Sequence, residues 1–129
     1  RRTYLFLKRG ARILKLNDFQ LTEHFNLAEF QCPCCLTVKV SPQLVLMLEE
    51  VRKRWGKPLI VHSGFRCEPH NKEVGGVKFS LHRHGRAADI RAAASEQESL
   101  RSLAAEAGFA KVIMYKDRGF IHLETGGNC

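Results

Sequence analysis

The chain has 129 residues, which is long enough for one domain with a buried core but not for two. A hydrophobic content of 44% is typical of a soluble globular protein, and no apolar run approaches the ~20 residues that a membrane-spanning helix needs. The net charge of +8 indicates attraction to polyanions, but the Lys and Arg residues are scattered and no helix-turn-helix or stacking-aromatic motif accompanies them, so we do not expect nucleic acid as a partner.

The first residues differ in character from the rest of the chain. Residues 1–24 are basic and weakly patterned, and we expect them to form an extended arm with a short strand at 13–16. The arm is expected to lie on a single domain formed by residues 25–129.

Two helices are predicted next. Residues 25–30 form a short one, in which Asn26 is the N-cap and Glu29 completes a capping box. A longer helix begins at Ser41, a capping hydroxyl followed by proline, and ends at Gly56. Its apolar residues recur at helical spacing and form one face: Leu44, Leu48, Val51 and Trp55. Its charged residues are expected to point outward: Glu49, Glu50, Arg52 and Lys53.

The second half of the chain alternates strands and helices. Strands are predicted at 58–62, 87–91, 109–115 and 120–125, and the last two form a hairpin. A helical turn is predicted at 68–74, and a longer helix runs from a second capping box, Ser95 with Glu98, to Gly108. These strands are too few and too interrupted for a doubly wound sheet, so the pattern indicates the α+β class.

The clearest chemical signal is a set of potential metal ligands. His82 and Asp89 are separated by Gly85 and two alanines, a spacing that suits a tight turn feeding a strand, so both side chains can point at one cation. His122 offers a third ligand. Three protein ligands leave a fourth position for water, which is the arrangement of a catalytic zinc site. The spacing alone also fits a surface pair or a hydrogen-bonded core pair.

The residues around these ligands resemble a known family. The string at 80–90, S-L-H-R-H-G-R-A-A-D-I, resembles the motif S-x-H-x-x-G-x-A-x-D of the M15 metallopeptidases, and it is also very close to the matching segment of the hedgehog signalling domain. Other M15 motifs are matched in order at 63–66, 71–76 and 119–124. The resemblance implies an antiparallel sheet flanked by helices, with zinc bound on one sheet face by His82, Asp89 and His122.

The resemblance also implies roles for two residues near the metal. In the M15 peptidases, an arginine at the position of Arg66 contacts substrate and stabilises the charge that develops on the attacked carbonyl, a task suited to a planar, permanently charged donor. Ser80 is expected to orient the turn or to donate to substrate.

The general base is where the sequence departs from the family. Many relatives place an acid three residues before the last histidine, or a histidine two before it, but the chain has Gly119 and Phe120 there. Neither can accept a proton. The acids available nearby are Asp117, in the predicted hairpin turn, and Glu124, on the same side of the strand as His122.

Five cysteines pose a separate question. Their spacing, C-x2-C followed by C-x2-H, is typical of a closed structural zinc site. The expected ligands are Cys32, Cys35, Cys67 and His70, with Cys34 as an alternative. A disulfide to Cys67 and a reduced, metal-free cluster are the other two interpretations. Any disulfide scheme leaves one cysteine unpaired, which we expect to be Cys129.

The combined pattern predicts a zinc-dependent peptidase that cuts a bond in peptidoglycan stem peptides, as a D-Ala-D-Ala carboxypeptidase or as an endopeptidase of endolysin type. We expect a monomer that acts outside the cytoplasm, in the periplasm or cell wall, or a phage-encoded enzyme that acts on the host wall. The rival hypothesis is a hedgehog-like module in which zinc is structural and the surface binds a partner without cutting it. The missing base at Gly119 and Phe120 motivates this rival.

Overall fold

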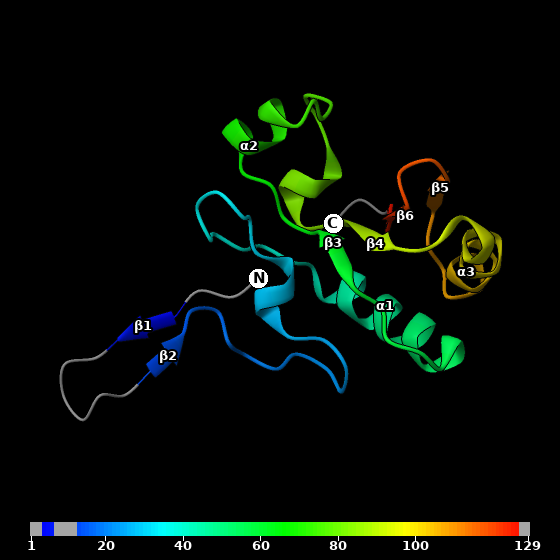
Figure 1. Cartoon of the computed structure of the whole chain (residues 1–129), viewed down its shortest axis with the longest axis horizontal. Helices are drawn as coiled ribbons and strands as arrows, with labels where there is room; N and C mark the ends of the chain where they lie inside the picture. Colours follow the sequence, from blue (N-terminus) through cyan, green and yellow to red (C-terminus); the bar gives the residue numbers. More distant parts are fainter. Residues whose placement is uncertain (1–3, 7–12, 127–129) are drawn as a thin grey trace.

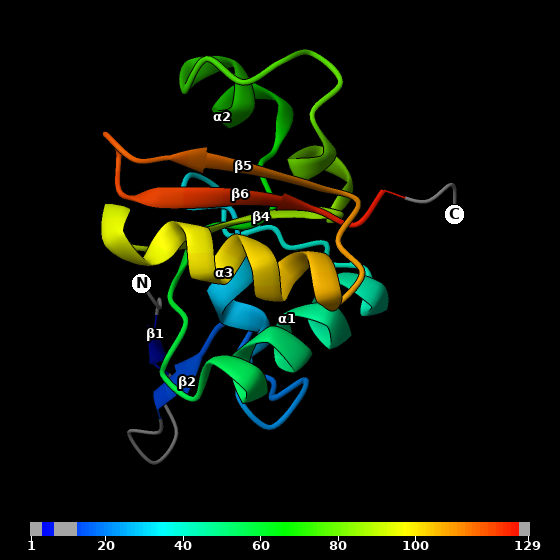
Figure 2. The same ribbon diagram turned by 90° about the vertical axis from the view of Figure 1, so that its right-hand side faces the viewer.

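A computed structural model describes residues 4–6 and 13–126. Its centre is a four-stranded antiparallel sheet of order β3-β4-β6-β5. These strands are Val61–Ser63, Ala87–Arg91, Phe120–Glu124 and Lys111–Tyr115. Helices α1 (Pro42–Trp55) and α3 (Ala94–Glu106) lie on one side of the sheet, and the short helix α2 (Glu68–Glu73) lies on the other (Figures 1 and 2). The predicted α+β class is confirmed.

The two faces of the sheet differ because side chains alternate along each strand. Toward the helices, the central strands present only apolar side chains, which join the core: Ala88, Ile90, Ile121 and Leu123. The helices contribute Leu44 and Leu48 from α1, and Leu100 and Ala104 from α3. The opposite face carries Asp89 on β4 and His122 on β6, which are direct cross-strand partners.

Helix α1 confirms its predicted boundaries. The Ser41 hydroxyl accepts a hydrogen bond from the Leu44 amide at 3.1 Å, and Gly56 ends the helix with a left-handed φ of 72°. The predicted outward position of Glu49 is wrong. Its side chain is buried because His24 lies against this part of the helix, and it accepts hydrogen bonds from the backbone and ring of His24.

Several predicted boundaries differ in the structure; strand β5, for example, begins at Lys111 rather than at Phe109. Strand β3 begins at Val61 rather than at Pro58, which has no N–H to contribute to a strand ladder. Helix α3 starts at Ala94, so the predicted box of Ser95 and Glu98 is wrong. The chain leaving β4 already turns at Ala93, whose carbonyl accepts from the Glu96 amide at 2.8 Å.

Short 3-10 helices flank the sheet. One, η2 (Leu27–Phe30), begins with the predicted capping box, in which the Asn26 side chain accepts from the chain ahead and Glu29 accepts from the Asn26 amide at 2.8 Å. The other, η3 (Leu81–His84), forms the turn that leads into β4 and ends at Gly85. In the part of the chain that the structure describes, no helix has the length and apolar character needed to cross a membrane.

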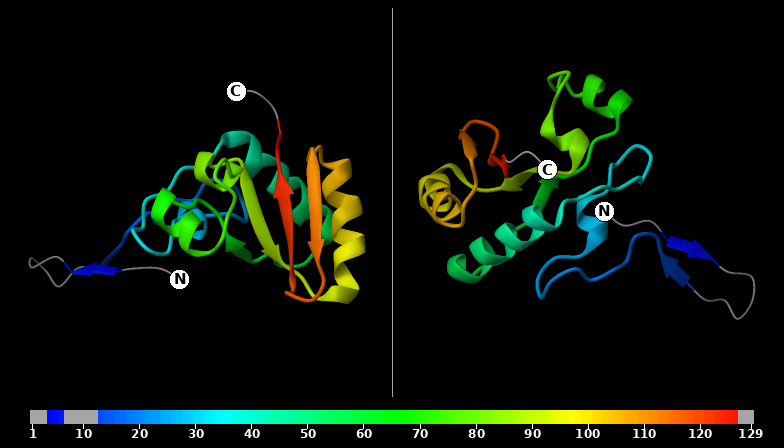
Figure 3. Two further views of the ribbon diagram at one scale, coloured as in Figure 1. Left: turned by 90° about the horizontal axis from the view of Figure 1, so that it is seen from above. Right: turned by 180° about the vertical axis from the view of Figure 1, so that it is seen from behind.

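The N-terminal segment contains two short paired strands. The predicted strand near residue 13 is β2 (Ile13–Lys15), which pairs with β1 (Tyr4–Phe6) in antiparallel register. Figure 3 shows this pair projecting from the body of the protein rather than lying on it. Asn17 contacts the body of the protein, since its side-chain amide donates to Gln31 and to the Leu36 carbonyl, each at 2.8 Å. The predicted division into an arm and a domain at residue 24 stays a prediction.

Candidate metal centre

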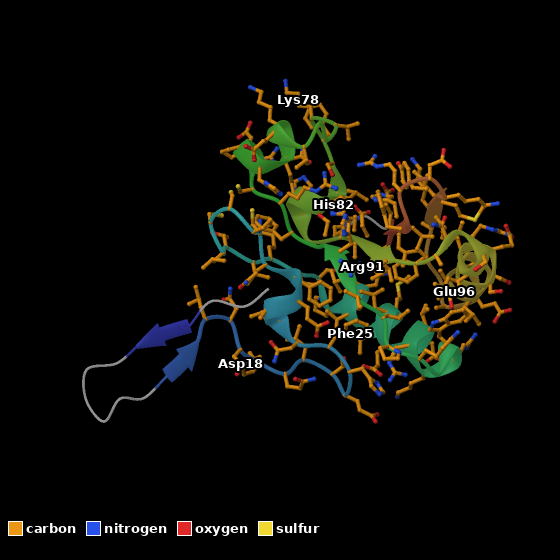
Figure 4. All side chains as sticks on the ribbon, viewed as in Figure 1. Asp18, Phe25, Lys78, His82, Arg91 and Glu96 are labelled. Carbon is orange, nitrogen blue, oxygen red and sulfur yellow. The ribbon has the colours of Figure 1, made fainter. Side chains whose placement is uncertain are left out.

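Three polar side chains converge on the open face of the sheet. His82 Nε2 lies 3.3 Å from His122 Nδ1, and Asp89 Oδ1 lies 2.9 Å from that nitrogen and 3.3 Å from His82 Nε2. His82 is labelled in Figure 4, where η3 meets the sheet. The three residues predicted as ligands are thus brought together, with His82 and Asp89 buried and His122 partly exposed.

The separations of these atoms fit a single metal ion. A tetrahedral ion with bonds of about 2.0–2.1 Å holds its ligand atoms about 3.3 Å apart, close to the distances between the two imidazole nitrogens and the carboxylate oxygen. Two nitrogens and one carboxylate oxygen are a donor set that suits zinc. Three ligands also leave one tetrahedral position open toward the cleft.

Each of the two histidines is oriented by a bond from its other ring nitrogen. His82 Nδ1 lies 2.8 Å from the Gly64 carbonyl, to which it donates, so its Nε2 lone pair faces the centre. His122 uses the opposite pattern, since its Nε2 lies 2.8 Å from Glu124 Oε2 and its Nδ1 faces the centre. Such outer bonds fix the tautomer and the ring angle of metal-binding histidines.

The electrostatics of this group favour ionised side chains. Burial lowers the pKa of His122, but hydrogen bonds to Asp89 and Glu124 outweigh it and hold the pKa above its ordinary value. Burial likewise raises the pKa of Asp89, whereas hydrogen bonds from His122 and His82 hold it well below its usual range. In the metal-free protein, His122 therefore keeps its second ring proton to a higher pH than an ordinary histidine, and a bound metal ion would compete with that proton.

Arg66 holds the Asp89 carboxylate through the oxygen that does not face the histidines. Its Nη2 donates to Asp89 Oδ2 at 3.3 Å, so the two carboxylate oxygens are divided between the guanidinium and the histidines. The guanidinium is held in turn by Ser63 Oγ at 3.1 Å and Asn71 Oδ1 at 3.0 Å. Burial lowers the pKa of Arg66, while Asp89 raises it, and the net shift is downward.

The centre lies in an open cleft of about 950 Å³. Its walls include Lys111, Tyr115 and Phe120 from the β5–β6 hairpin and Val77 and Phe79 from the loop before η3. The Phe120 ring, two residues before His122, stacks on His62 with ring centroids 5.2 Å apart. A ring in this place shapes the wall but transfers no proton.

The remaining predicted residues fall in different places. Ser80 lines the cleft and caps η3, with Oγ accepting from the His82 amide at 3.1 Å, which is the turn-orienting contact expected of it. Glu124 lines the cleft beside His122. Asp117 is exposed in the hairpin turn and lines a separate hollow formed by residues 114–118. Its carboxylate is not among the groups that line the metal cleft.

A family model described as Peptidase M15 matches residues 23–124, about four fifths of the chain. The chain belongs to the peptidase M15 family. It is therefore a metallopeptidase in general character, and the family resemblance seen in the sequence is confirmed. Among curated proteins, no match to the chain is found.

Away from the metal centre, the fold brings four cysteine sulfurs close together. The group consists of Cys32, Cys34, Cys35 and Cys67. His70, which the predicted site included, is not in this group: it lines the metal cleft, and its Nδ1 lies 3.6 Å from Glu73 Oε1. None of these four cysteines forms a disulfide. Cys129 lies outside the described residues.

Sequence reasoning missed the residues that support the ligands. The Gly64 carbonyl is a backbone group and carries no side-chain signal, although the 63–66 motif contains it. Asn71 could have been found from the 71–76 motif, where it holds Arg66 and also donates to the Val77 carbonyl at 2.8 Å. Glu124 was noted as an acid near the metal, but its bond to His122 depends on the strand geometry.

Proposed function

We propose that this M15 metallopeptidase is a zinc-dependent peptidase that hydrolyses a peptide bond in peptidoglycan stem peptides, as a carboxypeptidase or as an endopeptidase of endolysin type. The observation that supports it is the convergence of His82, Asp89 and His122, with ligand atoms 2.9 to 3.3 Å apart, in an open cleft. Zinc held by these ligands would supply Lewis-acid polarisation of a carbonyl and activation of a water molecule.

In this proposal, Arg66 acts on the substrate carbonyl. Its three bonds to Asp89, Ser63 and Asn71 use three of the five guanidinium N–H groups and fix its plane at the cleft wall. The remaining donors and the permanent charge can stabilise a developing oxyanion or bind a substrate carboxylate. Ser80 keeps its hydroxyl proton, because its oxygen is the acceptor in the helix cap, and this proton can be donated to substrate.

Glu124 is the acid that the geometry favours for proton handling. Among the described residues that line the cleft, the other carboxylates are Asp89, which faces the metal position, and Glu29, which caps η2. Glu124 contacts His122 through Oε2 and is partly exposed to the cleft. Asp117 would have to move from the hairpin turn to take part.

The charge of the protein supports a polyanionic, carboxylate-rich substrate. The chain carries a net charge of +8, and Lys111 and Arg118 line the cleft together with Arg66. Peptidoglycan stem peptides carry free carboxylates, and wall polymers are anionic. Our proposal therefore includes action outside the cytoplasm, or on a host wall by a phage-encoded enzyme. A monomer suffices for it, since one chain supplies all three ligands.

The test is mass spectrometry of fragments that zinc-loaded protein releases from purified peptidoglycan. His122→Ala removes one ligand, and His84→Ala replaces an exposed histidine of the same motif as a matched control. We expect release by the native protein and by His84→Ala, and none by His122→Ala or by chelated protein. The mass of the fragments identifies the bond.

A non-catalytic binding module is the second candidate, favoured by the presence of Phe120 where relatives carry a proton-transferring group. It predicts zinc binding without fragment release, together with retention of intact peptidoglycan on the native protein. Such an outcome would replace the peptidase proposal, because the metal would then be structural.

A further inference from the structure

A second set of four side chains surrounds one point outside the cleft. Cys34 Sγ lies 3.2 Å from Cys67 Sγ, and Cys32 Sγ lies 3.5 Å from Cys34 Sγ and 3.6 Å from Cys67 Sγ. The ligand atoms of all four cysteines, with Cys35 as the fourth, lie within 4.8 Å of one another. The sulfurs come from two segments: a tight turn after η2, and the residue that precedes α2.

These distances fit an ion better than a covalent bond. A disulfide requires sulfurs about 2.05 Å apart, whereas a tetrahedral zinc with Zn–S bonds of about 2.3 Å holds its sulfurs about 3.8 Å apart. The observed separations of 3.2 to 3.6 Å are near the second value. They are too short for the sulfurs to enclose a cluster of several iron atoms.

The backbone around the turn is arranged to bring the sulfurs together. The Cys32 amide donates to the Thr37 carbonyl and the Leu36 amide donates to the Cys32 carbonyl, each at 2.8 Å. Leu36 adopts a left-handed φ of 63°, which costs free energy for a residue with a side chain. A bound ion would offset this cost, because the turn brings Cys32, Cys34 and Cys35 close enough together to bind it.

We propose that Cys32, Cys34, Cys35 and Cys67 bind one zinc ion as a closed four-thiolate site. Four protein ligands leave no position for water or substrate, so this ion is structural. The site is separate from the His82, Asp89 and His122 centre and does not depend on the proposed peptidase activity.

The location of this site gives it a second consequence. Cys67 directly follows Arg66, and the Phe65 amide donates to the Phe30 carbonyl at 2.7 Å. Gly64 is packed so closely on Phe30 that a Cβ there would lie 2.6 Å from the Phe30 Cα. The structural zinc therefore fastens the segment whose Gly64 carbonyl holds His82 and whose Arg66 holds Asp89. Its ligands are positioning residues for the cleft.

The experiment is metal analysis of the full chain, combined with cobalt substitution. The native protein is expected to contain two zinc ions and His122→Ala one. Cobalt-loaded His122→Ala is expected to show intense sulfur-to-cobalt charge-transfer absorption in the near ultraviolet, which nitrogen and oxygen ligands do not produce. Cys34→Ser removes one of the four sulfurs and should weaken this absorption, whereas Cys129→Ser leaves all four proposed ligands in place and should keep it unchanged.

Two results would overturn the proposal. One is a cobalt-loaded His122→Ala protein, folded by circular dichroism, that lacks the charge-transfer band. The other is three or fewer reactive thiols in the native chain after unfolding in chelator without reductant, since an internal disulfide consumes two of the five. Both measurements use proteins with all four cysteines intact, so they remain decisive if Cys34→Ser does not fold.

Discussion

Asp89 and His122 face each other across strands β4 and β6, with Asp89 Oδ1 2.9 Å from His122 Nδ1. The two residues are 33 positions apart in the chain, so their contact depends on the register of the sheet. The pair is buried on one side by the core and open on the other to the cleft. Its protonation state therefore couples metal binding to the stability of the fold.

The first prediction concerns pH and the metal-free protein. The pKa of His122 is raised on folding, so its contribution to stability is complete below its unfolded pKa of about 6.5 and is lost as pH rises through the folded value. The pKa of Asp89 is lowered, so its contribution is present above about 3.9 and is lost as pH falls through the folded value. Chelated protein should thus have its highest Tm between these two pH values.

Zinc should change the alkaline side of this profile. Because zinc binds deprotonated His122, the zinc-dependent increase in Tm should grow as pH rises from about 6 to about 8. Thermal melts with zinc and with chelator measure both curves. A chelated His122→Ala protein should lack the loss of stability that begins near neutral pH, and an unchanged loss in this variant would contradict the assignment to His122.

Glu124 could act as the general base or orient His122, and two substitutions distinguish these roles. Gln at this position keeps an oxygen that accepts from His122 Nε2 but cannot take up a proton, whereas Ala removes both functions. If Glu124 is the general base, Glu124→Gln and Glu124→Ala should both lower kcat by about 100-fold or more while zinc content is retained. Near-normal kcat in Glu124→Gln with a loss in Glu124→Ala would instead assign Glu124 to the orientation of His122.

A substitution at Gly76 can test the role of Arg66 without replacing Arg66 itself. A Cβ on Gly76 would lie 2.1 Å from Asn71 Oδ1 and 2.8 Å from Arg66 Nη1, so Gly76→Ala should displace the guanidinium. We expect kcat/KM to fall by about 10- to 100-fold with unchanged zinc content. Gly75→Ala is the matched control, because a Cβ there meets nothing within 4 Å and only the φ of 77° is strained. Equal losses in the two variants would indicate loop strain as the cause.

Glu49 and Glu50 are neighbours on α1 that should differ in their effect on stability. Glu49 is buried and accepts from the His24 amide at 2.9 Å, and Glu49→Ala leaves that donor without its partner, which should cost about 1–3 kcal/mol of unfolding free energy. Glu50→Ala loses only an exposed ion pair with Arg54 and should change stability by less than about 1 kcal/mol. Urea unfolding measures both, and equal effects would mean that the contact between His24 and Glu49 does not stabilise the protein.

The elements of the fold were predictable where local chemistry decides them. Ser41 and Gly56 carry their helix boundaries in their own side chain and backbone preferences, so α1 was predicted correctly. The start of α3 was not, because Ala93 is held by the chain leaving β4 and has no capping side chain. The burial of Glu49 depends on His24, 25 residues away, and no periodicity within α1 contains that information.

The candidate site shows the same division between local and long-range information. His82, Asp89 and His122 could be recognised because their residue types and the motif around them are visible in the sequence itself. The groups that hold these ligands in place could not be predicted. The Gly64 carbonyl has no side-chain signal, and the contact of Arg66 with Asp89 joins a loop residue to a strand residue 23 positions away. For the cysteines, spacing alone suggested His70, whereas the turn at Leu36 brings Cys34 to the group.

Side chains alternate between the core and the cleft along β4 and β6, so the function of these strands depends on their exact number of residues. Deleting Ala88 would shift the parity of the rest of β4, so that Asp89 would face the helices and Ile90 would face the cleft. A substituted ligand removes one donor from an ion, but this deletion would also bury a charge among apolar side chains. Over Ala87–Arg91, where only the last residue is exposed, a change of residue number should therefore be more damaging than the substitution of any single residue.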